Sequence, residues 1–190
     1  EALERNERLK AISPVVLEAL SPLGRRAFFP KGIPFQAGQA KDCRINATIG
    51  QITDGAGKPL PLAPMAEQVP HLNPADAFLY APIQGRDSTR KAWHRKLVAE
   101  DARMERVALG QVAVGICHAL SLVADLFFAP GETLILPDLY WDNYETIFQV
   151  RLEGEFKTFP FYNAEGGFNV EGLRATLAAH PGKANVLLNF

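Results

Sequence analysis

The sequence predicts an α/β fold in which a mostly parallel sheet is flanked by helices, and three observations support that prediction. First, short apolar segments at 107–114 and 133–136 have the length and composition of buried strands. Second, a segment with helical periodicity separates them, and parallel neighbours need such a crossover. Third, strand and helix patterns continue to alternate after residue 150, which favours a sheet covered on both faces.

The segment between these two strands predicts an amphipathic helix that begins at Ile116. Pro130-Gly131 predicts the turn that follows this helix and leads into the second strand. The apolar residues of the helix are spaced three and four positions apart, which places them on one face; they are Ile116, Ala119, Leu120, Val123 and Phe127.

The turn from the first strand into this helix is a candidate anion site. Gly115 follows the strand directly, and the helical pattern begins at the next residue. The first N–H groups of a helix have no internal partner, and the helix dipole favours negative charge there. The backbone of Gly115, Ile116 and Cys117 is therefore able to wrap a phosphate. A single glycine is equally compatible with an ordinary turn that binds nothing.

Three aromatic residues and an asparagine follow the second strand, in the segment 137–144. Ligands of open α/β sheets bind at the carboxyl ends of the strands, where this segment is expected to lie. A flat aromatic side chain beside a phosphate-binding turn suits a phosphorylated aromatic ring. The alternative for Tyr140, Trp141 or Tyr144 taken singly is that it fills a core or an interface.

The remaining segments predict elements that fit the same plan. Ser13 as N-cap and Pro14 at the first helical position predict the start of a helix near the N-terminus. Asn169 is the expected N-cap of a helix near the C-terminus. The expected elements are helices at 1–11, 13–23, 35–41 and 169–179, strands at 44–50, 155–161 and 184–188, a loop that runs to residue 64 after the first of these strands, and a turn at 163–167.

The segment 86–96 is basic, but we interpret it as a solvated helix face and not as a nucleic-acid site. Trp93 and Leu97 are four residues apart, as expected for the buried stripe of an amphipathic helix. Asp87 or Ser88 is the expected N-cap. Acidic neighbours offset the positive charge; they are Glu100, Asp101 and Glu105.

Composition limits the classes of protein that remain. The 190 residues suit one or two domains, and the net charge of −1 gives no general attraction to nucleic acid or membrane. Apolar residues make up 47% of the chain, enough for a core, but no run approaches the length of a membrane span. Cys43 and Cys117 are too few for a disulfide framework, which favours the cytoplasm. We expect neither a nucleic-acid partner nor a metal site.

The segment 107–148 resembles the pyridoxal-phosphate (PLP) aminotransferases of the aspartate aminotransferase family, class I/II. In that family a Gly-Ala-Thr-like turn opens the helix that holds the cofactor phosphate. The corresponding residues here are Gly115, Ile116 and Cys117, and the resemblance implies that they hold the phosphate. A Pro-x-Trp/Tyr-x-x-Tyr/His loop supplies the ring that stacks on the pyridine. The resemblance implies that Trp141 stacks on PLP, with Tyr140 as the alternative. It also implies that Asn143 supports the loop.

Two upstream segments extend the resemblance. Residues 45–50 are similar to the family's Asn-Leu-x-Ile-Gly stretch, which would place Ile49 and Gly50 against the substrate. An Asp-x-x-Gly-Lys-Pro turn follows that stretch in the family, and the resemblance implies such a turn here at 54–59. Residues 80–85 are similar to its Tyr-x-Pro-x-x-Gly segment, which implies that Tyr80 reaches the phosphate of the neighbouring subunit in a homodimer. Without the resemblance, the first segment predicts a small hydrophobic strand with a hairpin turn. The second predicts a tyrosine that packs before a turn.

The resemblance covers about three quarters of the chain, with two departures from the family pattern. Cys117 stands where the family usually has Thr or Ser, and a thiol is a weak hydrogen-bond donor. The chain also ends at Phe190, where the family's Asn-Pro-x-Asn-Pro-Thr-Gly motif would begin. The Schiff-base lysine comes later in the family, so we identify no catalytic residue. We expect a truncated, N-terminal fragment that is inactive alone.

The resemblance implies an aspartate aminotransferase-like fold and a domain organisation. Residues 1–81 would form an N-terminal arm and part of the small domain, and residues 82–190 the first part of the large PLP-binding domain. The implied reaction transfers an amino group from an amino acid to a 2-oxo acid. A PLP lyase of the same fold and a non-catalytic, aminotransferase-like sensor or dimerisation module are the alternatives.

Overall fold

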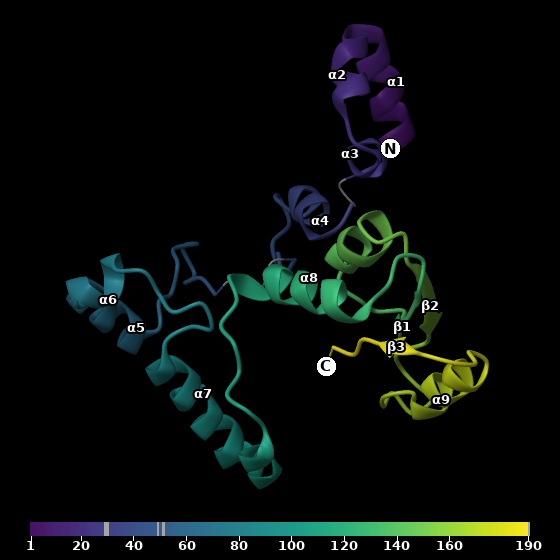
Figure 1. Cartoon of the computed structure of the whole chain (residues 1–190). Helices are drawn as coiled ribbons and strands as arrows, with labels where there is room; N and C mark the ends of the chain where they lie inside the picture. Colours follow the sequence, from purple (N-terminus) through teal and green to yellow (C-terminus); the bar gives the residue numbers. More distant parts are fainter. Residues whose placement is uncertain (29–30, 49, 51, 190) are drawn as a thin grey trace. The chain divides into compact units, whose positions relative to one another are not determined.

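The structure is a computed structural model that describes residues 1–28, 31–48, 50 and 52–189 (Figure 1). The chain divides into two compact units. We call residues 1–48 and 117–190 the sheet unit, and residues 49–116 the helical unit. Each unit is described by itself.

Among the residues that the structure describes, the sheet unit has three strands, which are parallel as the sequence predicts. They are β1 (Thr133–Pro137), β2 (Glu155–Phe159) and β3 (Asn185–Val186), in the order β2-β1-β3. Strand β1 pairs with β2 from Thr133 opposite Glu155 to Pro137 opposite Phe159, and with β3 from Leu134 opposite Asn185. The central strand is therefore hydrogen-bonded on both sides, and every residue of β1 is buried.

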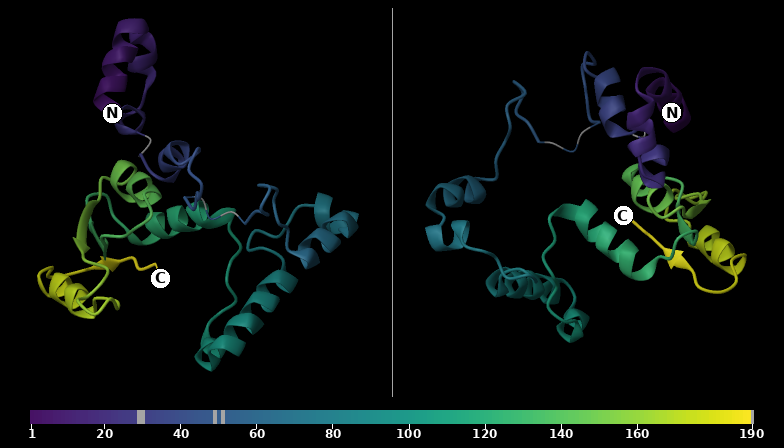
Figure 2. Two further views of the ribbon diagram at one scale, coloured as in Figure 1. Left: turned by 180° about the vertical axis from the view of Figure 1, so that it is seen from behind. Right: turned by 45° about the horizontal axis from the view of Figure 1, so that its top comes forward.

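Helices cover both faces of this sheet (Figure 2). Helix α8 (Gly115–Phe127) precedes β1, and the short π-helical turn η3 (Glu145–Val150) follows it. Helix α9 (Val170–Ala178) lies on the other side of the sheet (Figure 2). Asn169 caps α9 as predicted, because its side chain accepts a hydrogen bond of 2.8 Å from the Gly172 N–H.

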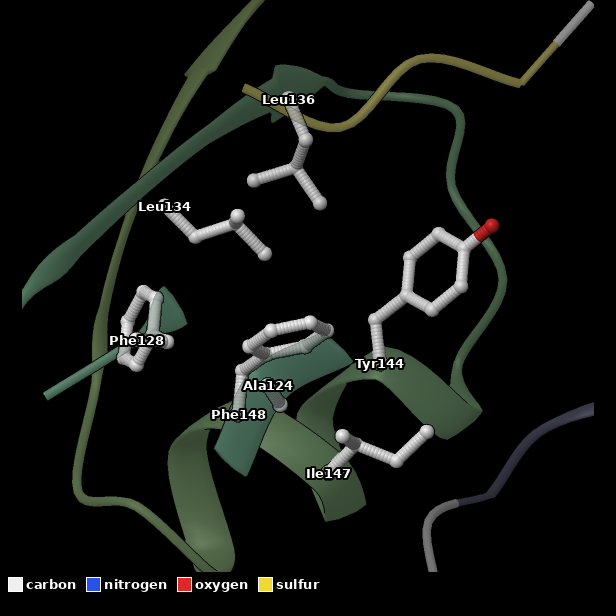
Figure 3. Close-up of a cluster of buried hydrophobic side chains, with 7 residues drawn as sticks. All are labelled: Ala124, Phe128, Leu134, Leu136, Tyr144, Ile147 and Phe148. Atoms are coloured by element: carbon white, nitrogen blue, oxygen red, sulfur yellow. The ribbon is translucent and has the colours of Figure 1, made fainter. Parts of the chain in front are cut away.

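The hydrophobic core lies between β1, α8 and η3 (Figure 3). Side chains alternate between the faces of a strand, so Leu134 and Leu136 point together toward α8 and η3. The rings of Phe128 and Phe148 meet edge to face, with centroids 5.3 Å apart. The core cluster consists of Ala124, Phe128, Leu134, Leu136, Tyr144, Ile147 and Phe148.

The N-terminal part of the sheet unit is helical, but two separate helices stand where the sequence predicts a single one. The predicted helix at 13–23 is interrupted because Leu20 is extended and Pro22 starts a new helix, which Ser21 caps. Arg26 joins this region to the end of η3: its guanidinium donates to the carbonyls of Val150 and Arg151. The N-terminal helices are α1 (Ala2–Ile12), α2 (Pro14–Ala19), α3 (Pro22–Arg26) and α4 (Ile33–Gln39).

The helical unit contains short helices and one longer helix, α7 (Asp87–Glu100). Two expectations about α7 are wrong. Arg86 is its N-cap, so Asp87 and Ser88 lie inside the first turn. Trp93 is 57% exposed instead of buried, and Lys96 lies over its ring. The other helices are α5 (Ala63–Gln68), η1 (Val69–His71), α6 (Pro74–Phe78) and η2 (Ala102–Arg106).

Two predicted strands are absent from the residues that the structure describes. The segment 107–114 is extended but has no neighbouring strand; Val112 donates instead to the Gln84 carbonyl. In the segment 44–48 the Asn46 side chain accepts from the N–H and hydroxyl of Thr48, and this local turn replaces a ladder. The predicted turn at 54–59 is confirmed, with Asp54 accepting from the N–H groups of Ala56 and Lys58.

Candidate functional site

Helix α8 opens with a glycine in a conformation that other residues rarely adopt. Gly115 has φ +80°, while a Cβ built on it would meet nothing within 4 Å. Backbone conformation, and not space, therefore explains the glycine. Gly115, Ile116 and Cys117 are all exposed at the start of the helix. The N–H groups of Ile116 and Cys117 belong to the first turn, which has no intrahelical partners to offer them, whereas the Gly115 N–H donates to the Ala113 carbonyl at 3.0 Å.

The aromatic loop, residues 138–144, leaves β1 at the carboxyl end of the sheet. Its first residue is fixed twice: the Asp138 N–H donates to the Phe159 carbonyl at 2.8 Å, and the Asp138 carboxylate accepts from the Phe161 N–H at 2.8 Å. Its last residue, Tyr144, is buried in the core. The segment between these anchors carries Tyr140, Trp141 and Asn143, as the sequence predicts.

The two candidate stacking rings differ in their surroundings. Tyr140 packs edge to face on Phe156, and its hydroxyl donates to the Glu145 carboxylate at 3.0 Å. Burial, together with this carboxylate, raises the pKa of the Tyr140 hydroxyl. Trp141 is half-buried and meets Tyr144 edge to face, with centroids 5.7 Å apart. Tyr140 is thus engaged by the fold at its ring and its hydroxyl.

A hydrogen bond joins the aromatic loop to the first turn of α8. The Asn143 side-chain amide donates to the Cys117 sulfur at 3.0 Å, although the two residues are 26 positions apart. The bond joins the two segments that the sequence analysis expected to lie beside each other. The thiol at position 117, a departure from the family pattern, is the acceptor in this bond.

Sequence reasoning missed one residue beside the loop. Gly32 is buried, and a Cβ built on it would lie 1.2 Å from a carboxylate oxygen of Asp142. The backbone of the segment before α4 thus lies against the Asp142 side chain, and a larger residue at position 32 would require that side chain to move. Nothing in the sequence pattern around Gly32 pointed to Asp142.

The upstream candidates lie in the helical unit. Ile49 falls outside the described residues, and Gly50 is exposed in a loop. Tyr80 is fully exposed and lines a pocket with Asp76 and Arg86, which form an ion pair at 2.6 Å. Within the described part of the chain, no cluster of His, Cys, Asp or Glu has the geometry of a metal site. No helix there is long and apolar enough to cross a membrane.

Comparison with known proteins identifies the family. The family model "Aminotransferase class I and II" matches residues 44–189, which include both the first turn of α8 and the aromatic loop. The chain belongs to the class I and II aminotransferases. This assignment confirms the family that the sequence motifs indicate.

Individual aminotransferases resemble the chain over part of their length. The mitochondrial aspartate aminotransferase of Dictyostelium discoideum is 29% identical over 153 residues, which are 77% of this chain and 35% of that protein. The cytoplasmic aspartate aminotransferase of Saccharomyces cerevisiae superposes with a TM-score of 0.66 at 21% identity, covering 92% of this chain and 43% of that one. An aminotransferase from Anaerococcus prevotii gives the same score at 22% identity, covering 87% and 43%.

These superpositions confirm the aspartate aminotransferase-like fold. The chain spans less than half of the length of the aminotransferases that it matches. At this level of identity the structures establish the fold alone, and the chemistry of the site has to be argued from the residues of this chain.

Proposed function

We propose that this chain forms part of a PLP-dependent aminotransferase that transfers an amino group from an amino acid to a 2-oxo acid. The observation that carries the proposal is the bond between Asn143 and Cys117, which places the aromatic loop beside the first turn of α8. Membership of the class I and II aminotransferases supports the same reaction. The alternative lyase activity has no specific observation in its favour.

The residues present fit the two recognisable parts of PLP. An anionic phosphate suits the N–H groups of Ile116 and Cys117, two exposed residues of the first turn of α8, and Gly115 adopts the positive φ that lets the backbone turn before them. A flat pyridine ring suits a half-buried indole. Among the loop aromatics, Tyr140 is held by the bond from its hydroxyl to Glu145 and Tyr144 is buried in the core, which leaves Trp141 for this role. When bound, PLP supplies an electron sink for the carbanion that forms on the amino acid.

The roles of the chain's own residues follow from their positions. Gly115, Ile116 and Cys117 would form the phosphate site and so fix one end of the cofactor: Ile116 and Cys117 would donate their N–H groups, and Gly115 would let the backbone turn around the phosphate. Trp141 would cover one face of the ring and exclude water from it. Tyr140 would support the loop, because its ring and hydroxyl already pack on Phe156 and Glu145.

The stacking role is tested by substitution in the full-length protein. Trp141→Ala should weaken PLP binding about tenfold, the loss expected for one aromatic stacking contact worth roughly 1.4 kcal/mol. Trp93→Ala is the matched control, because Trp93 is the other tryptophan and lies exposed on α7. PLP dissociation constants from fluorescence titration give the comparison. Equal affinities in the wild type and Trp141→Ala would remove Trp141 from the site.

We also propose a homodimer in which Tyr80 donates to the phosphate held by the partner subunit. Its full exposure supports a role outside its own unit. Tyr80→Phe should weaken PLP binding by the one charged hydrogen bond lost, roughly 1.5–3 kcal/mol. Tyr162→Phe, a change at another exposed tyrosine, is the control. A hybrid dimer with the change in one subunit should have one weak and one normal site, and two normal sites would show that Tyr80 does not cross.

Domain organisation and substrate contacts complete the proposal. We infer an N-terminal arm and small-domain portion at 1–81 and the first part of the large domain at 82–190, with Ile49 and Gly50 facing the substrate. The compact units divide the chain at other positions, between residues 48 and 49 and between 116 and 117. The family motifs, and not the packing of the chain, support the proposed boundary.

A further inference from the structure

The residue that joins the two halves of the site is itself held rigidly. Asn143 lies in a tight turn in which the Tyr144 N–H donates to the Trp141 carbonyl at 2.9 Å. The next N–H, of Glu145, donates to the Asp142 carbonyl at 3.1 Å. Tyr144 follows directly and is buried in the core. The core therefore fixes the backbone directly after Asn143, at Tyr144. Trp141 precedes Asn143 in the same loop.

The direction of the hydrogen bond determines what it does to Cys117. The Asn143 amide nitrogen is a donor only, so the sulfur accepts. This arrangement fixes the side-chain rotamer of Cys117 and leaves its S–H proton available to a second acceptor. It also holds the third residue of α8 at a set distance from the loop that carries Trp141.

We propose that Asn143 is a positioning residue that clamps the aromatic loop to the first turn of α8 through Cys117. The clamp keeps the ring of Trp141 and the N–H groups of the turn at one fixed separation. A ligand that spans both, with an anionic group at one end and a flat ring at the other, then binds without first ordering the loop. This inference rests on the proposed function, because PLP is the ligand of that shape.

Hydrogen exchange of the cofactor-free, full-length protein tests the clamp itself. Asn143→Ala should increase exchange of the loop amides at 138–144 and of the first turn of α8 at 115–118. Exchange in β1 should not change, because both neighbouring strands still protect it. Asn163→Ala is the matched control, since the Asn163 side chain accepts from the N–H groups of Glu165 and Gly167 within its own turn at 163–167. Unchanged exchange at 138–144 in Asn143→Ala would overturn the clamp.

A double-mutant cycle on PLP affinity tests the positioning role. Asn143→Ala and Cys117→Ala should each weaken PLP binding about fivefold, the effect of one neutral hydrogen bond. The double variant should be no weaker than the Cys117→Ala variant, since the partner is already gone. In a Cys117→Ser background the hydroxyl still accepts, so Asn143→Ala should again cost about fivefold.

The outcomes of this cycle separate the two proposals. A wild-type protein that takes up no PLP overturns the proposed function, and with it the role assigned to Asn143. A wild-type protein that binds PLP while Asn143→Ala has unchanged affinity overturns only the positioning role. Losses that multiply in the double variant would show that Asn143 acts independently of Cys117, and they would overturn the role as well.

Discussion

Strand β1 in the sheet unit and the segment 107–114 in the helical unit are both short apolar runs, but they are buried to very different extents. Every residue of β1 is buried, and Ile135 and Leu136 have no exposed surface at all. In the other segment Val112 is 51% and Val114 is 86% exposed. Similar sequences therefore have opposite environments.

The difference lies in what each segment's backbone bonds to. Strand β1 has a parallel neighbour on each side, and helices then cover the faces of the sheet. The segment 107–114 bonds instead to α7 and its preceding loop: Arg90 donates to the carbonyls of Leu109 and Gly110, and Gln84 accepts from Val112. An apolar composition shows that a segment could be buried. Whether it is buried depends on the neighbouring strands that pair with it.

The largest expected effect comes from truncating one apolar side chain in each segment. Leu136→Ala should lower the free energy of unfolding by about 2–5 kcal/mol, since it leaves a cavity in the core. Val112→Ala should cost less than about 1 kcal/mol, because half of its side chain is already in water. Denaturant unfolding of both variants measures the contrast. Equal costs would mean that the segment 107–114 is buried in the folded protein as β1 is.

A second contrast uses two arginines with closely similar contacts. Arg26 donates to the carbonyls of Val150 and Arg151 and pairs with Glu153 at 3.1 Å. Arg90 donates to two successive carbonyls and pairs with Asp87 at 3.1 Å. However, the Arg26 contact to Val150 joins residues 124 positions apart, whereas Arg90 bridges about 20.

Arg26→Ala should therefore reduce global stability by about 1.5–3 kcal/mol, the range for hydrogen bonds from a charged group. Arg90→Ala should mainly increase hydrogen exchange at 107–112, because its carbonyl partners lie outside the core cluster. Hydrogen exchange together with denaturant unfolding separates the local effect from the global one. A larger global loss in Arg90→Ala than in Arg26→Ala would reverse the comparison.

The N-caps of α9 and α6 give a third contrast between the two units, with a smaller expected effect on the free energy of unfolding. Asn169 accepts from the Gly172 N–H at 2.8 Å at the start of α9, and Asn73 accepts from the Ala75 N–H at 3.0 Å at the start of α6. Asn169→Ala should cost about 1 kcal/mol, because α9 packs on the sheet. Asn73→Ala should cost less, since α6 has five residues and none of them is buried. Thermal unfolding of the two variants measures the difference, and equal losses would show that α6 is coupled to the fold.

The sheet unit could be predicted from sequence because its signals are local and agree with its packing. The α8 periodicity, the Asn169 cap and the strand at β1 each follow from neighbouring residues. Pro22 could have been interpreted as the break in the second helix. The strand predicted at 107–114 is wrong because its local apolar signal says nothing about partner strands.

The sequence predicted the two segments of the candidate site and that they lie beside each other, but not the contacts that join them. Gly115 and Trp141 carry recognisable patterns, and the family motifs gave them roles. The contact of Asn143 with Cys117 and that of Asp142 with Gly32 join residues far apart in the chain. Such contacts depend on tertiary packing, and a single sequence carries no record of it.

The smallest expected effect concerns two carboxylates whose pKa values are lowered in the two units. Hydrogen bonds from Lys183, then from the Ala129 N–H and Asn185, lower the pKa of Glu132. Its contact with Lys183 spans 51 residues and joins the start of β1 to the segment before β3. The side chain and N–H of Arg103, two residues along the chain, lower the pKa of Asp101.

A carboxylate with a lowered pKa contributes stability that is present above its unfolded pKa, about 4.3 for Glu and 3.9 for Asp, and is lost as the pH falls through its folded pKa. Glu132→Gln should therefore destabilise the protein at pH 7, and its difference from the wild type should shrink below about pH 4. Asp101→Asn should show less of this dependence, because a contact between residues two apart persists in part after unfolding. Free energies of unfolding at a series of pH values test the contrast. If the pH dependence for Asp101→Asn is as large as that for Glu132→Gln, the sequence separation of two contacting residues does not determine how much their contact contributes to the free energy of unfolding.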